Sequence, residues 1–154
     1  DWSSDVCSSD LLMEEINMKI SARNQFKGTI KSIKEGSVNS IVTITLGSAD
    51  ISATISMDAV KELELEIGKE AYAIVKATEV MVACEKLAGL SARNQLEGTI
   101  ESINEGAVNA IVKIACGDYK ISSTVSIDAV KELELSTGKT VYAIIKATSV
   151  MVGV

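Results

Sequence analysis

The sequence predicts an all-β fold that is built twice, as two small five-stranded barrels in tandem with one short helix in each. Residues 21–83 align without a gap to residues 91–153, at a constant offset of 70 and with about two-thirds of the positions identical. Polar and apolar residues alternate along short segments rich in β-branched side chains, which is typical of strands with one wet face. One segment in each copy has the period of a helix instead.

The first copy starts with three segments that have the pattern of strands. We expect these strands at residues 26–33, 38–46 and 51–56, because β-branched and polar residues alternate there. Glu35-Gly36 and residues 47–50 interrupt the alternation and are expected to form turns.

A helix and two more strands complete the copy. Residues 57–65 place their apolar side chains on one helical face, and Ser56 stands where an N-cap is expected. Residues 71–76 and 80–83 predict a fourth and a fifth strand. Five short strands with a helix between the third and the fourth is the order of an OB-like barrel.

The chain is expected to divide into five segments. Residues 1–12 hold the single Trp, lack an amphipathic period and resemble a translated sequencing adapter, so we exclude them from the fold; a genuine disordered tail is the alternative. Residues 13–20 form a lead-in, and 21–83 and 91–154 are the two modules. The connector, 84–90, is short and not Gly/Ser-rich, so the modules are expected to sit close together.

Composition excludes several classes of function. The chain contains no His, which removes the usual general base and the commonest zinc ligand. Cys7, Cys84 and Cys116 match no CxxC spacing and are interpreted as free thiols. No apolar run approaches the roughly 20 residues of a membrane span, and no secretory signal is recognisable. We therefore expect a cytoplasmic protein that is not an enzyme, with no catalytic residues, organic cofactor, metal-cation site or membrane partner.

The formal net charge of −6 is concentrated outside the two modules. Residues 21–83 carry seven basic and eight acidic side chains, and residues 91–153 carry six and seven, so each module is nearly neutral. An acidic chain lacks the basic face that nucleic acid needs. An OB-type nucleic-acid binder remains a weak alternative, because aromatic residues for base stacking make up only 3% of the chain.

Arginine gives the clearest indication of a site. The only two arginines, Arg23 and Arg93, lie in two copies of Ser-Ala-Arg-Asn-Gln. The guanidinium is a planar fork of donors that fits the oxygens of a carboxylate or a tetrahedral oxyanion. A barrel of this size fills its own interior, so any site is expected on the rim or between modules.

The residues expected to serve a small dianion supply hydroxyl, amide or cationic donors. Ser56 and Ser126 also precede helices, whose N-termini favour anions. Simpler interpretations stay open: Ser56 as an N-cap alone, Lys76 as a strand residue with its amine in water, Arg23 in a surface ion pair and Asn24 as a turn former. The predicted oxyanion-binding set is Ser21, Arg23, Asn24, Ser56, Lys76, Thr78, Ser91, Arg93, Asn94, Ser126, Lys146 and Thr148.

The order of these motifs resembles the Mop family of molybdenum-binding, TOBE-like modules. The pentapeptide is followed by Gly-Thr-Ile, then Glu-Gly-Ser/Ala-Val-Asn, Lys-Glu-Leu-x-Leu, Gly-Lys and finally Lys-Ala-Thr-x-Val-Met. Two such modules in one chain are similar to a di-Mop molbindin. The resemblance implies cytoplasmic binding, storage and homeostasis of molybdate, and usually of tungstate, at sites between modules and subunits of a homotrimer.

The resemblance also implies a second class of oxyanion site near the axis of the oligomer. In this chain it would use Val38, Asn39, Val108 and Asn109. Some relatives have a helical serine where this chain has Ala59 and Ala129, so one hydroxyl donor is absent. The alternative function is an oxyanion-sensing regulatory module that acts with a separate transcription or transport partner, because no helix-turn-helix segment or P-loop is recognisable here.

Overall fold

The computed structural model describes residues 19–154. The predicted segment 1–12, most of the lead-in 13–20 and Cys7 lie outside the described residues. The first module contains β1 (Asn24–Glu35), β2 (Asn39–Thr45), β3 (Asp50–Ser56), α2 (Met57–Glu62), β4 (Glu70–Val75), the 3₁₀ helix η1 (Ala77–Glu79) and β5 (Met81–Ala83). The second contains β6 (Asn94–Glu105), β7 (Asn109–Cys116), β8 (Tyr119–Ser126), α3 (Ile127–Glu132), β9 (Thr140–Ile145), η2 (Ala147–Ser149) and β10 (Met151–Gly153). The predicted all-β class and the order of elements are confirmed.

The first strand of each module is longer than predicted because it serves two neighbours. Residues 24–29 of β1 pair with β4, and residues 29–35 pair with β2, both antiparallel. The register shifts between Ile30 and Ser32, a bulge that bends the strand between its two partners. The second module repeats this arrangement in β6.

The helices are shorter than predicted, because the backbone turns left-handed two residues after each one. Helix α2 ends at Glu62, and Glu64 has a φ of 52°. The Lys69 amine then donates to the carbonyl oxygens of Leu63 and Glu64, at 3.0 and 3.1 Å. Gly68, with a φ of 94°, makes the turn into β4, where a left-handed backbone suits glycine.

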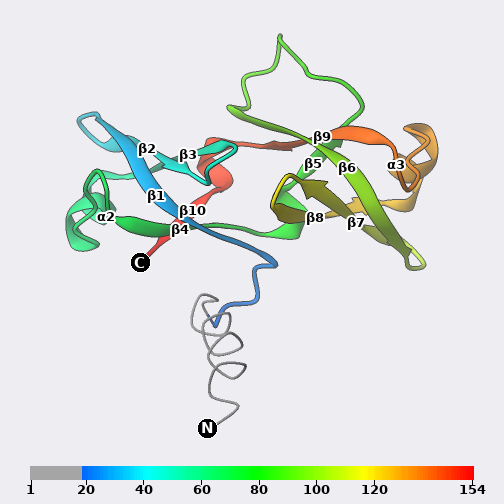
Figure 1. Cartoon of the computed structure of the whole chain (residues 1–154), viewed down its shortest axis with the longest axis horizontal. Helices are drawn as coiled ribbons and strands as arrows, with labels where there is room; N and C mark the ends of the chain where they lie inside the picture. Colours follow the sequence, from blue (N-terminus) through cyan, green and yellow to red (C-terminus); the bar gives the residue numbers. More distant parts are fainter. Residues whose placement is uncertain (1–18) are drawn as a thin grey trace, which may run out of the picture.

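Each barrel takes its last strand from the other repeat. The sheet order is β10-β4-β1-β2-β3 in one barrel and β5-β9-β6-β7-β8 in the other. Figure 1 shows the C-terminal strand β10, in red, lying beside β4 of the first module, while the green β5 lies in the second module. The two barrels are therefore interlocked, and neither repeat supplies all five strands of its own sheet.

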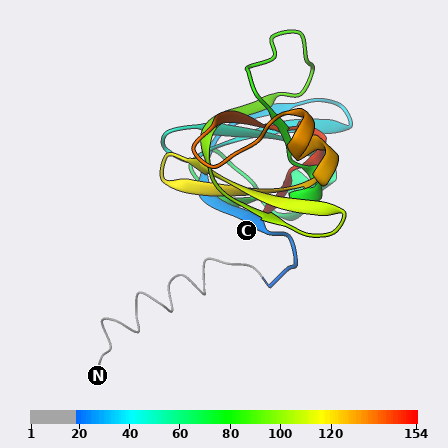
Figure 2. The ribbon, with the colours of Figure 1, turned by 90° about the vertical axis from the view of Figure 1, so that its right-hand side faces the viewer.

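The core of both barrels is aliphatic, as the scarcity of aromatic residues predicts. Its largest fully buried side chains are isoleucines and valines, among them Ile30, Ile44 and Val75 in the first module. Seen along the long axis of the molecule, the two barrels overlap, and the connector between the modules stands out as a loop (Figure 2). In the part of the chain from residue 19 onward, no helix has the length and apolar character that a membrane span requires.

Candidate functional site

A pocket of about 220 Å³ lies where the second module meets β3 of the first. Four of the predicted oxyanion residues line it together: Ser91, Arg93, Lys146 and Thr148. Ala92, Ala147 and the first module's Thr54 complete the lining. The pocket therefore lies between modules, and all of its polar side chains can donate hydrogen bonds.

Strand pairing explains why these residues meet although they are about 55 positions apart in the chain. Asn94 of β6 pairs with Ile145 of β9, so Arg93 and Lys146, the next residues outward, lie at the same edge. The 3₁₀ helix η2 then turns the chain so that Thr148 also reaches the pocket. Because η2 packs against β3, the side chain of Thr54 forms the opposite wall.

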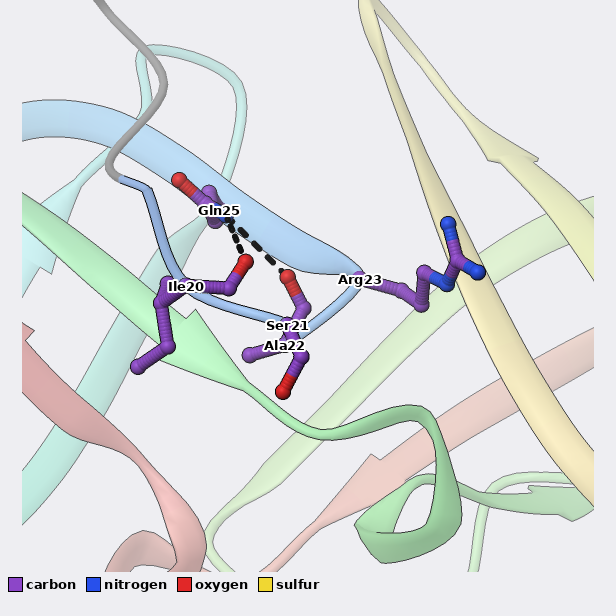
Figure 3. Close-up of a pocket in the computed structure, with 5 residues that line it drawn as sticks. All are labelled: Ile20, Ser21, Ala22, Arg23 and Gln25. Carbon is purple, nitrogen blue, oxygen red and sulfur yellow. Dashed lines mark hydrogen bonds between the residues drawn. The ribbon is translucent and has the colours of Figure 1, made fainter.

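The opening motif of the first module lines a second pocket, of about 370 Å³. Its lining consists of Ile20, Ser21, Ala22, Arg23 and Gln25 (Figure 3). The Gln25 amide donates to the carbonyl oxygens of Ile20 and Ala22, at 3.4 and 3.1 Å, which fixes this turn. The Arg23 side chain extends away from the other four labelled residues.

Lys76 and Thr78 do not line that second pocket, although topology places them nearby. Asn24 pairs with Val75, so Arg23 and Lys76 lie at the same edge of the first barrel, as Arg93 and Lys146 do in the second. The 3₁₀ helix η1 packs against β8, just as η2 packs against β3. Thr124 of β8 therefore occupies the position that corresponds to Thr54.

The electrostatics of the first-described pocket favour an anion. No carboxylate lines it, whereas Arg93 and Lys146 both do. Between residues 19 and 154, the salt bridges join Lys27 to Glu70, Lys31 to Asp50 and Lys120 to Glu101. Neither arginine takes part in one within that range, so the surface ion pair considered for Arg23 is not formed there.

Ser56 and Ser126 cap helices and do not line either pocket. Their hydroxyl oxygens accept hydrogen bonds from the backbone N–H of Ala59 and Ala129, at 3.0 and 3.1 Å. Ser56 lies two residues beyond Thr54 on β3, and side chains two apart share a face of a strand. Topology therefore places Ser56 on the side of the Arg93 pocket, although Ser56 belongs to the same module as Arg23.

The residues predicted for a second class of site lie beside these caps. Asn39 pairs with Ser56 in the β2–β3 ladder, and Asn109 pairs with Ser126 in the β7–β8 ladder. Val38 and Val108 are 69% and 72% exposed, although both are apolar. Both modules therefore expose a β-branched apolar side chain at the same position.

Asn24 and Asn94 are buried and turned away from the pockets. The Asn94 side-chain oxygen accepts from the backbone N–H of Ser52 at 2.8 Å, and its NH₂ donates to the Ser52 carbonyl at 2.9 Å. Asn24 makes the same two bonds to Ser122 of the second module, at 2.8 and 2.9 Å. Both polar atoms of each side chain are therefore already bonded to backbone.

Sequence reasoning missed Thr54 and Thr124. Their one signal was the repeated Ile-Ser-Ala/Ser-Thr of the third strand, which alternates like any half-buried strand. Only the contact between η2 and β3 brings Thr54 to the pocket of Arg93, and η1 makes the same contact with β8, the strand of Thr124. In residues 19–154, no group of three or more Cys, Asp or Glu side chains is arranged to hold a metal ion.

Comparison with known proteins identifies the family and supports the fold. The TOBE domain model matches residues 20–82 and 90–152. A crystal structure of the cytoplasmic molybdate-binding protein ModG, with molybdate bound, superposes with a TM-score of 0.85 at 45% identity, and the match covers 89% of this chain and 99% of that one. A probable molybdenum-pterin-binding protein of Haemophilus influenzae is 64% identical over 69 residues, which is 44% of this chain and the whole of that protein.

Longer relatives match both modules at once. The molybdenum transport protein ModE of Herbaspirillum seropedicae is 40% identical over 147 residues, which is 93% of this chain and 54% of ModE. The ModE of Azotobacter vinelandii is 38% identical over 97% of this chain and 56% of its own length. The chain thus spans about half the length of these two relatives. With two matches to the TOBE model and a close structural neighbour that has the same two-module fold, the chain belongs to the TOBE-domain family as a tandem pair of Mop modules.

Proposed function

We propose that this chain binds molybdate reversibly in its inter-module pockets and serves to store and buffer it in the cytoplasm. The observation that carries the proposal is the pocket of Ser91, Arg93, Lys146, Thr148 and Thr54. It gathers two cations and three hydroxyl groups from two modules without a carboxylate. The corresponding residues of the other site are Ser21, Arg23, Lys76, Thr78 and Thr124, of which Ser21 and Arg23 line the pocket of the first module.

The chemistry of the pocket suits a tetrahedral dianion. Molybdate needs no covalent step, so binding requires only charge and hydrogen-bond donors placed around four oxygens. Arg93 can donate two parallel hydrogen bonds, and Lys146 adds a second positive charge. Tungstate has the same charge and shape and is expected to bind at the same place. The relatives' molybdenum-related names support this choice over sulfate or phosphate.

We further propose that the chain assembles into a homotrimer with additional oxyanion sites between subunits. The support is the exposed Val38 and Val108, which lie beside Asn39 and Asn109 at the same position of each module. Burying these apolar side chains against another subunit would bring the hydroxyl groups of Ser56 and Ser126 toward the interface. The sequence repeats at 21–83 and 91–154 would then be the units that alternate around the assembly.

Native mass spectrometry tests these proposals together. The chain is titrated separately with molybdate, tungstate, sulfate and phosphate, and the masses of oligomer and bound ion are read from the same spectra. We expect trimers that take up several molybdate or tungstate ions and little sulfate or phosphate. Equal uptake of sulfate would reduce the function to general anion binding, and a monomer at all concentrations would contradict the assembly.

The regulatory role is a second candidate, favoured by the match to half of ModE. Under that proposal, the modules sense molybdate and report to a separate transcription or transport partner. Storage and sensing differ in how occupancy depends on the concentration of free molybdate, because a sensor must respond to small changes in that concentration. Fractional occupancy measured across free molybdate concentrations distinguishes them: a store fills several sites over a broad range, whereas a sensor switches over a narrow one.

A further inference from the structure

The asparagine of each Ser-Ala-Arg-Asn-Gln motif is the feature that the proposed binding role does not explain. Asn24 and Asn94 are only 1% and 3% exposed, in a motif whose serine and arginine are exposed. Each places its amide against a single backbone residue of the other module, Ser122 or Ser52. The same pair of bonds occurs in both modules, which indicates that the two asparagines have the same structural role.

Each asparagine side chain bonds to the N–H and the C=O of one edge-strand residue, as a neighbouring strand would. A side-chain amide carries one acceptor oxygen and an NH₂ donor, so it can match the C=O and N–H that a strand residue presents at its edge. Both β3 and β8 are edge strands, at the end of the sheet opposite to β10 and β5, and have backbone groups left over at that edge. Asn94 satisfies those of Ser52, and Asn24 satisfies those of Ser122, so that neither residue leaves partly buried backbone groups unpaired.

The same asparagine also fixes three walls of the pocket relative to one another. The backbone of Asn94 pairs with Ile145, which places Arg93 beside Lys146. Its side chain holds Ser52, two residues before Thr54 on the same face of β3. Asn94 therefore connects the three segments that carry Arg93, Lys146 and Thr54.

We infer that Asn24 and Asn94 are positioning residues, which hold each arginine against the other module's wall of the pocket and do not themselves contact the oxyanion. This inference rests on the proposed function. It changes the role that sequence reasoning gives these two residues, because each side-chain amide is nearly fully buried and is bonded through both its oxygen and its nitrogen to one backbone residue of the other module. The arginine, which has no such anchor of its own, depends on its neighbour for its placement.

A double-mutant cycle tests the inference on the full chain. An Arg23→Ala background disables the pocket of Arg23, so that molybdate titration calorimetry reads the pocket of Arg93. Asn94→Ala, Arg93→Ala and the double variant are then compared, at a temperature well below the melting point of each. We expect Asn94→Ala to lower the melting temperature without ligand and to weaken molybdate binding about tenfold, because a misplaced arginine loses its paired hydrogen bonds.

The cycle distinguishes a positioning role of Asn94 from direct binding of the oxyanion and from a purely structural role. If Asn94 acts through Arg93, Asn94→Ala causes no further loss of affinity once Arg93 is alanine. A full additional loss in that background would mean that Asn94 binds the oxyanion directly, and it would overturn the inference. Unchanged affinity in a folded Asn94→Ala protein would show a purely structural role and would overturn it as well.

Two further variants keep the test decisive. Ser40→Ala is the control, because Ser40 is a buried polar residue that bonds to the Lys34 carbonyl and has alanine at its counterpart, Ala110. It is expected to leave the affinity unchanged. If Asn94→Ala does not fold, Asn94→Ser enters the cycle, since a hydroxyl can keep one of the two bonds. Absence of molybdate uptake by the unmodified chain would contradict the proposed function itself, and with it the positioning role.

Discussion

The two arginines are the residues on which the proposed sites depend most. Both side chains are exposed, and neither has a salt-bridge partner between residues 19 and 154, so their removal should hardly affect folding. The guanidinium fork, beyond its charge, is what the proposed pocket uses. A substitution that keeps the charge but loses the fork therefore isolates that contribution.

We expect Arg23→Lys combined with Arg93→Lys to weaken molybdate binding about 10- to 100-fold, because an ammonium group cannot make two parallel hydrogen bonds to one oxyanion. The melting temperature without ligand should stay within about 1 °C, as for other surface substitutions. Calorimetric titration and thermal denaturation measure the two quantities. Lys61→Arg with Lys131→Arg, on the exposed faces of α2 and α3, is the control. Unchanged affinity would remove both arginines from the sites.

The buried thiol of Cys116 makes stability depend on alkaline pH. Burial raises the pKa of this thiol from its ordinary 9.0 to about 11. A group whose pKa is raised by folding stabilises the protein fully below the unfolded value, and that contribution is lost as pH rises through the folded value.

We therefore expect the free energy of unfolding to fall between about pH 9 and pH 11, measured by urea denaturation at each pH. Cys116→Ala should reduce this decline. It should not abolish it, because burial also raises the pKa of Tyr119. An identical decline in the alanine variant would show that the thiol does not contribute.

At the scale of single elements, the ends of the short helices store backbone strain. Glu64 and Glu134 both have a φ of 52°, a left-handed conformation that costs a non-glycine residue about 1 kcal/mol. The turn is held by Lys69 and Lys139, whose amines donate to the carbonyl oxygens of the two residues that follow each helix.

Glu64→Gly combined with Glu134→Gly is expected to raise the free energy of unfolding by about 1 kcal/mol in total, because glycine relieves the strain but adds entropy to the unfolded chain. Urea denaturation provides the measurement. The comparison variant, Glu62→Gly with Glu132→Gly, changes the last residue of each helix, where the backbone is right-handed, and should destabilise the protein. A loss of stability from both pairs would mean that the left-handed backbone carries no strain.

The first strand of each module needs a glycine where it crosses the second. A Cβ atom at Gly98 would lie 2.6 Å from the Ile114 side chain and 2.7 Å from both the Ala115 carbonyl oxygen and the Cys116 sulfur. Such contacts are too short for any side chain, so the neighbouring strand would have to move.

Gly98→Ala is expected to destabilise the protein by about 1 to 3 kcal/mol through this overpacking, as measured by urea denaturation. Gly89→Ala in the connector is the matched control, because nothing lies within 4 Å of a Cβ atom there. Its effect should stay within about 0.5 kcal/mol. Equal effects of the two substitutions would contradict the close approach of β6 and β7.

At the scale of the whole molecule, the exchange of last strands makes each barrel depend on the other repeat. Met151, Val152 and Gly153 of β10 pair with Ile74, Ala73 and Tyr72 of β4. The chain reaches this position through η2, the 3₁₀ helix that also carries Thr148 of the pocket. Barrel closure and pocket assembly therefore use the same crossing segment.

A chain that ends at Val150 should lose the edge of the first barrel while the second keeps its own edge strand, β5. We expect the free energy of unfolding to fall by about 2 kcal/mol and the amide protons of β4 to exchange faster than those of β9, because β4 loses its hydrogen-bonded neighbour. Amide exchange followed by NMR measures this asymmetry. Deleting Val154 alone is the control, since it is exposed and lies outside β10. Equal exchange in β4 and β9 would contradict the exchanged topology.

The sequence by itself determined the elements, because their signals are local. The repeat, the alternation of residues such as Val42 and Thr43, and the cap at Ser56 predict five strands and a helix in each module, as observed. The two arginines, together with Lys76 and Lys146 near the end of each module, indicated an oxyanion site. The structure brings Arg93 and Lys146 into one pocket. These predictions needed only short-range periodicity and side-chain chemistry.

Only the tertiary structure decided which module supplies each wall. The exchanged strands place Thr54 beside Arg93, turn Asn94 onto Ser52 and associate Ser56 with the arginine of the other module. The last strands of the two repeats, Met-Val-Ala in β5 and Met-Val-Gly in β10, have almost the same sequence. Either strand therefore fits the edge of either barrel, and its own sequence does not specify which. The path of the chain through η1 and η2 makes that choice, because each 3₁₀ helix packs against the opposite module.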